Sequence, residues 1–170
     1  MPDPDEEGGQ QTPIQKAQQM VDDIIKAGQP WTDPDFPPTA DSLANRDDDP
    51  QEAMKLRRLE WKRCTEVMPN CQVFQNDIHP NDINQGSLGN CYFLAVLSTM
   101  AERPDSVKAA FYTKEVNSAG IYLMYFYLNG IKQPVIVDDH IPTNGSRPAF
   151  SSTRDDEIWA MLMEKAWAKI

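Results

Sequence analysis

The chain has 170 residues and a mass of 19.3 kDa, the size of one domain or of one lobe of a larger one. Its 26 acidic residues exceed the 16 basic ones and give a formal charge of −10, a field that repels phosphate and argues against nucleic-acid binding. The longest apolar run, residues 121–128, is far shorter than the roughly 20 residues of a membrane span, so no transmembrane segment is expected.

Acidic residues and prolines concentrate in the first fifty positions, which therefore cannot bury much apolar surface alone. Within them, Thr12-Pro13 offers a helix cap, apolar residues follow at helical spacing, and Gly28 ends the pattern. We expect a helix over residues 13–27 inside an acidic N-terminal extension, residues 1–30. The main unit then covers residues 31–170, beginning with an extended, proline-rich strap at residues 31–38.

The amino terminus has neither a basic start nor an apolar stretch, so no secretory signal is expected. Three cysteines, Cys64, Cys71 and Cys91, form an odd set that argues against a disulfide framework. Reduced thiols and a cytoplasmic location follow as expectations.

The later elements have clearer patterns. A helix is expected to start at Asp49-Pro50, and another at Cys91, with Asn90 as its cap and Arg103-Pro104 at its end. The second is apolar nearly all round, which predicts central burial. Asn129-Gly130 predicts a hairpin between strands 121–128 and 131–138. An apolar stripe over residues 158–170 predicts a last helix, with Ser152 and Thr153 as possible caps.

The most informative segment is Gln85-Gly86-Ser87-Leu88-Gly89-Asn90-Cys91-Tyr92. Its glycines permit a tight turn that delivers Cys91 to the first turn of a helix, where unpaired N–H groups and the helix dipole favour a thiolate. The Gln85 amide could join the Cys91 N–H in holding a developing oxyanion. On spacing alone, Cys91 could equally be a small apolar residue at a helix start and Gln85 a turn residue.

This segment resembles the nucleophile signature of papain-like cysteine proteases, and of the calpain family most closely. Further blocks match that family in order: Thr32 to Pro38 with Ser42-Leu43, Trp61-Lys62-Arg63, Val135 to Pro142, and Glu157 to Lys169. The resemblance implies a mixed α/β fold of the α+β type. It would be a papain-like nucleophile lobe with a buried central helix, a small antiparallel hairpin and flanking helices.

The resemblance also implies an activity, calcium-dependent cysteine-type endopeptidase action in limited intracellular proteolysis, with protein or peptide substrates. Cys91 would be the nucleophile and Gln85 the oxyanion donor. The general-base His and the orienting Asn would lie in a second lobe that this chain does not contain, so the chain alone is expected to be nearly inert. His79 and His140 are interpreted as loop or surface residues.

Calcium is implied by the same resemblance. Asp82 and Glu157 would supply side-chain oxygens, and Gln75 and Asp77 would supply backbone carbonyls, a set of hard oxygen ligands that suits the ion. Pro80 stands where calcium-regulated members carry an Arg, and it cannot form that residue's salt bridge.

Two other interpretations stay open. The chain could be a non-catalytic, calcium-responsive regulatory or interaction module from a truncated protease. A structural zinc site from Cys64, Cys71, His79 and Cys91 is disfavoured because no Cys-x-x-Cys pair exists and the spacings are irregular.

Overall fold

The computed structural model describes residues 11–43, 50–75, 78–80, 83–84, 91–153 and 156–170. Its helices are α1 (Pro13–Ala27), the 3-10 turn η1 (Ala40–Ser42), α2 (Pro50–Leu56), α3 (Cys64–Val67), α4 (Cys91–Ala101), α5 (Pro104–Ala109) and α6 (Trp159–Lys169). Its strands are β1 (Glu60–Arg63), β2 (Ile121–Leu128), β3 (Ile131–Asp138), β4 (His140–Asn144) and β5 (Arg147–Pro148). This mixture confirms the expected α+β fold.

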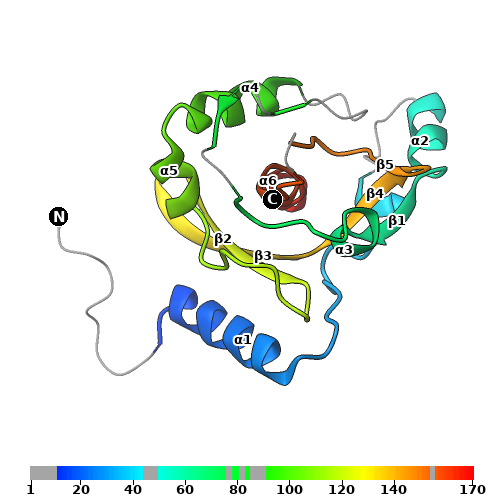
Figure 1. Cartoon of the computed structure of the whole chain (residues 1–170). Coiled ribbons are helices and arrows are strands. Elements are labelled where there is room, and N and C mark those ends of the chain that lie inside the picture. Colours follow the sequence, from blue (N-terminus) through cyan, green and yellow to red (C-terminus); the bar gives the residue numbers. More distant parts are fainter. Residues whose placement is uncertain (1–10, 44–49, 76–77, 81–82, 85–90, 154–155) are drawn as a thin grey trace.

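Helix α6 runs through the middle of the molecule, and the other elements surround it (Figure 1). Every residue from Trp159 to Ala166 is buried, including Glu164 and Lys165. Burial on all sides requires that the polar groups of this helix find partners inside the protein. The partners of these two charged side chains connect α6 to the rest of the fold.

The predicted hairpin is confirmed. Strands β2 and β3 pair antiparallel from Ile121 opposite Asp138 to Leu128 opposite Ile131. Asn129 and Gly130 make the turn with φ of 52° and 79°, the left-handed conformation that this dipeptide favours. A second sheet, in the order β1-β4-β5, was not predicted, because its short strands lack an extended alternating pattern.

Helix α1 begins and ends as the sequence predicts. Thr12 and Gln15 form a capping box, and Gly28 closes the helix with φ of 68°. The helix packs on the β2–β3 hairpin, where Val21 is fully buried, and Gln18 Nε2 donates to Tyr125 Oη at 2.6 Å. The division of the chain at residue 30 stays a prediction.

The expected central burial of the Cys91 helix is only partly right. Phe93, Leu94 and Leu97 on α4 are buried, but Tyr92 and Val96 are 62% and 52% exposed. These two side chains face a cleft instead of the interior. The apolar composition of α4 therefore reflects a core on one side and a cleft on the other.

The expected caps of the last helix are wrong. Ile158 is the N-cap residue of α6, and it makes no side-chain cap hydrogen bond. Ser152 instead pairs with Asn84, and the Thr153 hydroxyl donates to the Glu157 carbonyl at 2.9 Å. Long-range pairing has replaced the local capping that the sequence pattern suggested.

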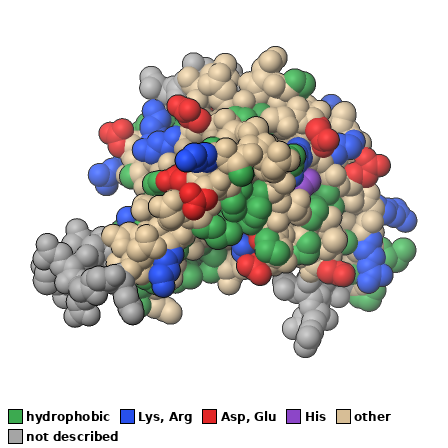
Figure 2. All heavy atoms as spheres, turned by 90° about the horizontal axis from the view of Figure 1, so that it is seen from below, with side chains coloured by type: hydrophobic (Ala, Val, Ile, Leu, Met, Phe, Trp, Pro, Cys, Tyr) green, Lys and Arg blue, Asp and Glu red, His purple; other side chains and the backbone are tan. Residues whose placement is uncertain are grey.

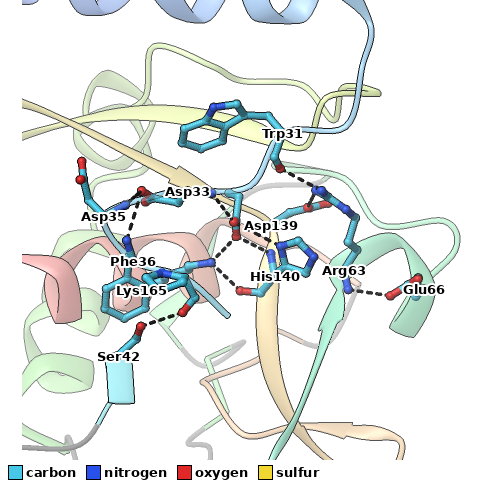
Figure 3. Close-up of polar contacts among 12 residues, drawn as sticks. Trp31, Asp33, Asp35, Phe36, Ser42, Arg63, Glu66, Asp139, His140 and Lys165 are labelled. Atoms are coloured by element: carbon cyan, nitrogen blue, oxygen red, sulfur yellow. Dashed lines mark hydrogen bonds and ion pairs between the residues drawn. The ribbon is translucent and has the colours of Figure 1, made fainter. Parts of the chain in front are cut away.

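A cluster of ion pairs, which we call the strap network, joins the strap to α6 (Figure 3). Lys165 Nζ forms an ion pair with Asp138, and both of these side chains are fully buried. The same Nζ donates to the His140 carbonyl at 2.7 Å. Lys169 Nζ lies 2.7 Å from Asp33 Oδ2, and the Asp33 N–H donates to Asp138 at 2.7 Å. Burial opposes the charge of Asp138, but Lys165 and the N–H groups of Asp33 and His140 together outweigh it and lower the pKa of this carboxyl.

The strap network is extended by Arg63, which pairs with Asp139 and donates to the Trp31 carbonyl at 2.8 Å. Gly120 adopts φ of 64° beside this pair, and a Cβ there would collide with both side chains. Burial nevertheless raises the pKa of Asp139 in spite of Arg63. Arg63, whose side chain is 19% exposed, is thus part of the strap network.

The surface carries mixed charge. On the face shown in Figure 2, the coloured basic and acidic side chains are interspersed and form no basic stripe. Within the described residues, no helix is both long and apolar enough to cross a membrane.

Candidate active site

The candidate nucleophile stands at the first position of α4, as predicted. Gln85 and the turn up to Asn90 lie outside the described residues, and the description does not extend to the side chain of Cys91. The structure does describe how the polypeptide is held on both sides of this turn. The chain after the turn begins helix α4, and the chain before it is held by residues 151–153 and 156–158, which we call the template segment.

The first contact fixes the chain near Gln75. Gln72 and Glu157 form a parallel bridge, in which the Gln72 N–H donates to the Asp156 carbonyl at 3.2 Å and the Ile158 N–H donates to the Gln72 carbonyl at 2.9 Å. The Gln75 N–H then donates to Glu157 Oε1 at 2.6 Å. A carboxylate that accepts a backbone N–H makes a strong, charge-assisted hydrogen bond.

The second contact fixes the chain next to Gln85. Asn84 and Ser152 form an antiparallel bridge with two hydrogen bonds, at 2.7 Å and 3.0 Å. The neighbouring Ser151 is bound by Glu164 of α6, whose Oε2 accepts from both the N–H and the hydroxyl of Ser151 at 2.6 Å. The residue before the candidate oxyanion donor is therefore tied, through two links, to the central helix.

The four residues predicted to bind calcium divide into two groups. Gln75 and Glu157 are brought together although 82 positions separate them, and Asp77 and Asp82 lie outside the described residues. The Glu157 side chain is buried, and its Oε2 also accepts from the Trp159 indole N–H at 3.0 Å. A buried carboxylate beside a peptide group is a set of hard oxygen atoms of the kind that calcium prefers.

The remaining cysteines do not have the environment of nucleophiles. Cys64 and Cys71 are free thiols in the main core, and burial raises the pKa of both. Together with His79 they form no cluster that could hold a metal within the described part of the chain. The zinc interpretation therefore gains no support from its three described residues.

His140 belongs to the strap network. Its Nδ1 lies 3.2 Å from Asp138, and its N–H donates to the same carboxylate at 2.8 Å. Strand β3, which ends beside His140, lies on the opposite side of α6 from α4 (Figure 1). The contacts that the structure gives His140 are thus those of the strap network. His79 is exposed.

An apolar cleft of about 490 Å³ lies beside the first turns of α4. Its walls come from α4, α5, the hairpin and α6, and its rim carries the exposed aromatic side chains of Tyr92, Tyr127 and Trp167. Phe93 stacks on Trp167 at 5.3 Å between ring centroids, and Trp167 Nε1 donates to Tyr92 Oη at 3.0 Å. Aromatic side chains at a cleft rim are typical of surfaces that bind other polypeptide.

Comparisons with known proteins agree with this architecture. Residues 31–170 match the family model described as calpain family cysteine protease. The chain belongs to the calpain family. It is 34% identical over 155 residues to the calpain-2 catalytic subunit of Bos taurus, covering 89% of this chain and 22% of that protein. It is 34% identical over 155 residues to calpain-5 of Caenorhabditis elegans, covering 86% of this chain and 23% of the relative.

Calpain-A of Drosophila melanogaster aligns over 168 residues at 32% identity, which is 95% of this chain and 19% of the fly protein. The chain therefore spans about a fifth of the length of these calpains. The comparisons place residues 31–170 in a family of cysteine proteases.

Sequence reasoning missed three residues that support the turn: Asn84, Ser151 and Glu164. Each contributes only through a contact distant in sequence, and no local pattern marks such contacts. The one available signal was Glu164 itself, a charged residue on the apolar stripe of the last helix.

Proposed function

We propose that this chain is the nucleophile-bearing part of a calcium-dependent cysteine endopeptidase that cleaves proteins or peptides. The observation that carries the proposal is the support on both sides of the Gln85–Cys91 turn, by α4 on one side and by the template segment on the other, in a chain of the calpain family. Such support suits a turn whose backbone must be held in one geometry during catalysis.

The residues would share the chemistry in a simple way. The Cys91 thiolate attacks the carbonyl carbon of the scissile peptide bond, the carbonyl oxygen becomes an oxyanion, and the Gln85 amide and the Cys91 N–H donate to it. Expulsion of the amine leaves an acyl group on the sulfur. The leaving amine must be protonated, and we assign this role to neither described histidine, because His140 is held in the strap network and His79 is an exposed loop residue.

The base is therefore assigned to polypeptide outside this chain, which is the proposed second catalytic lobe. The apolar cleft beside α4 provides a surface of suitable character for such a partner. Reduced, buried Cys64 and Cys71 suit a reducing compartment, and we assign the protein to the cytoplasm.

Calcium, when bound, would supply a positive charge that draws oxygen ligands together. We assign it to the Glu157 carboxylate, the Gln75 and Asp77 carbonyls and the Asp82 carboxylate. Glu157 and Gln75 already lie side by side, which supports this choice. The same two residues anchor the segment that leads to Gln85, so a change in their contact would reach the catalytic turn.

The alternative, a non-catalytic calcium-responsive module, is favoured only by the lack of a suitably placed base among the described histidines. A p-nitrophenyl ester of an N-acyl amino acid separates the two functions, because p-nitrophenolate leaves without being protonated. The proposal predicts a burst of about one equivalent of p-nitrophenolate per chain, no turnover of the matching anilide, and loss of the burst in Cys91→Ala. A wild-type chain without a burst would support the module.

Calcium binding has its own test. Calorimetric titration should detect the ion with the wild-type chain and not with an Asp82→Ala, Glu157→Ala double variant. Equal affinity in the two proteins would remove the proposed site.

A further inference from the structure

Three consecutive residues of the template segment, Ser151 to Thr153, each make a different contact. Ser151 is bound by Glu164 of α6, Ser152 pairs with Asn84, and the Thr153 hydroxyl donates to the carbonyl of Glu157. The position of Asn84 is therefore set by a segment whose own position is set by α6.

Glu164 is the link between α6 and Ser151. Its side chain is 2% exposed, and one oxygen accepts both the N–H and the hydroxyl of Ser151. Hydrogen bonds to a charged acceptor are stronger than neutral ones, and removing the acceptor would leave two buried donors of Ser151 without this partner. Because α6 is buried from Trp159 to Ala166, it gives Glu164 a rigid base from which to hold Ser151.

Asn84 directly precedes Gln85, and its double hydrogen bond to Ser152 fixes the backbone at that point. Helix α4 fixes the other end of the turn at Cys91. We propose that Glu164 is a positioning residue: through Ser151, Ser152 and Asn84 it sets where Gln85 begins relative to Cys91. The inference rests on the proposed function, since it assigns Glu164 a role in placing the oxyanion donor.

The test separates oxyanion stabilisation from thiol reactivity in one experiment on the whole chain. An N-acetyl dipeptide aldehyde adds to the Cys91 thiol; the S–C bond forms, the carbonyl π bond breaks, and the thiol proton ends on the new hydroxyl oxygen. Stabilising that oxygen requires the oxyanion donors. Iodoacetamide alkylates the same sulfur without forming an oxyanion. Site-resolved mass spectrometry of Cys91 alkylation at increasing aldehyde concentration yields the alkylation rate and the aldehyde Kd together.

Glu164→Met should raise the aldehyde Kd about tenfold or more and change the alkylation rate of Cys91 less than about twofold. Glu164→Gln should stay close to wild type, because an amide oxygen can still accept from both Ser151 donors. Ser151→Ala, which loses only the hydroxyl and should retain the fold, should raise Kd about threefold. The matched control is Glu66→Met, which removes a carboxylate that accepts the Arg63 N–H at 2.8 Å away from the turn and should leave both readouts unchanged.

Equal Kd values for the Glu164→Met, Ser151→Ala and Glu66→Met variants would overturn the inference and leave the proposed function standing. A parallel change in Kd and alkylation rate would also overturn it, because the thiol itself would then be displaced. If the aldehyde does not protect Cys91 of the wild-type chain from alkylation, both the proposed function and this inference are overturned.

Discussion

Helix α6 has two buried polar faces that do different things. Lys165 and Lys169, four residues apart, enter ion pairs with Asp138 and Asp33 and so join the helix to the strap. Glu164, and Glu157 just before the helix, instead accept neutral N–H and O–H groups of segments that lead to the Gln85–Cys91 turn. The lysines of this element therefore stabilise the fold through ion pairs, whereas the glutamates position neighbouring segments through hydrogen bonds.

The strap face should show the largest effect on stability. Asp138→Ala leaves the buried Lys165 ammonium without its carboxylate, which should lower the free energy of unfolding by about 3–5 kcal/mol. Denaturant unfolding followed by circular dichroism measures this. A matched Asp138→Leu, Lys165→Met double variant should recover part of the loss, since neither charge remains buried, while the Asp33 and His140 N–H groups still lack their acceptor. A single-variant loss below about 1 kcal/mol would show that the pair is not the main link.

The thiol at the catalytic turn, Cys91, should react very differently from the buried thiols of Cys64 and Cys71. Cys64, whose N–H donates to Asp139 beside the strap network, has a pKa that burial raises, and burial also raises the pKa of Cys71. Their thiolates should therefore appear only at higher pH, and their access is poor. At pH 7, Cys91 should be alkylated by iodoacetamide about a hundredfold faster than either. Similar rates for all three cysteines in site-resolved mass spectrometry would contradict the contrast.

The pH dependence of stability should belong to the strap face. Burial acts to raise the pKa of Asp138, but Lys165 and the N–H groups of Asp33 and His140 together lower it. The stabilising contribution of Asp138 is therefore present above its unfolded pKa, about 3.9, and is lost as pH falls through the folded value. The pKa of Asp139 is shifted in the opposite direction, mainly by burial, so its contribution is lost as pH rises. The stability difference between wild type and Asp138→Asn should hence shrink between pH 7 and pH 3. A stability difference between the two proteins that grows as the pH falls would contradict the lowered pKa of Asp138.

The smallest expected effect lies outside both faces. Thr12→Ala removes the capping box of α1 and should cost about 1 kcal/mol. Thr12→Ser keeps the hydroxyl acceptor and serves as the matched control. If thermal unfolding shows that Thr12→Ala destabilises as much as Asp138→Ala, the special weight given to the strap network is wrong.

Local chemistry explains which parts of the fold could be predicted from sequence. Thr12, Gly28 and the Asn129-Gly130 turn determine their own conformations, so α1 and the hairpin follow from a few neighbouring residues. The start of α4 at Cys91 was predictable for the same reason. Strands β1, β4 and β5 were not, because each is short and is defined by its partner.

The candidate site divides along the same line. Cys91 and Gln85 are marked by a compact motif, whereas Glu164 and Ser151 act only because the fold brings α6 beside the template segment. Glu157 shows both sides of this problem. The family resemblance marks it as a candidate metal ligand, whereas the contacts of its carboxylate with the Gln75 N–H and the Trp159 indole arise only in the folded chain.

We propose that Cys91 and Gln85 act together at the turn whose preceding segments are held by Glu157 and Glu164. The most direct measurement is the rate of acylation by the p-nitrophenyl ester, with the acylated residue located by mass spectrometry. We predict that the acyl group is found on Cys91 alone and that Gln85→Ala slows its formation about a hundredfold. Acylation of Cys64 or Cys71, or an unchanged rate in Gln85→Ala, would contradict it.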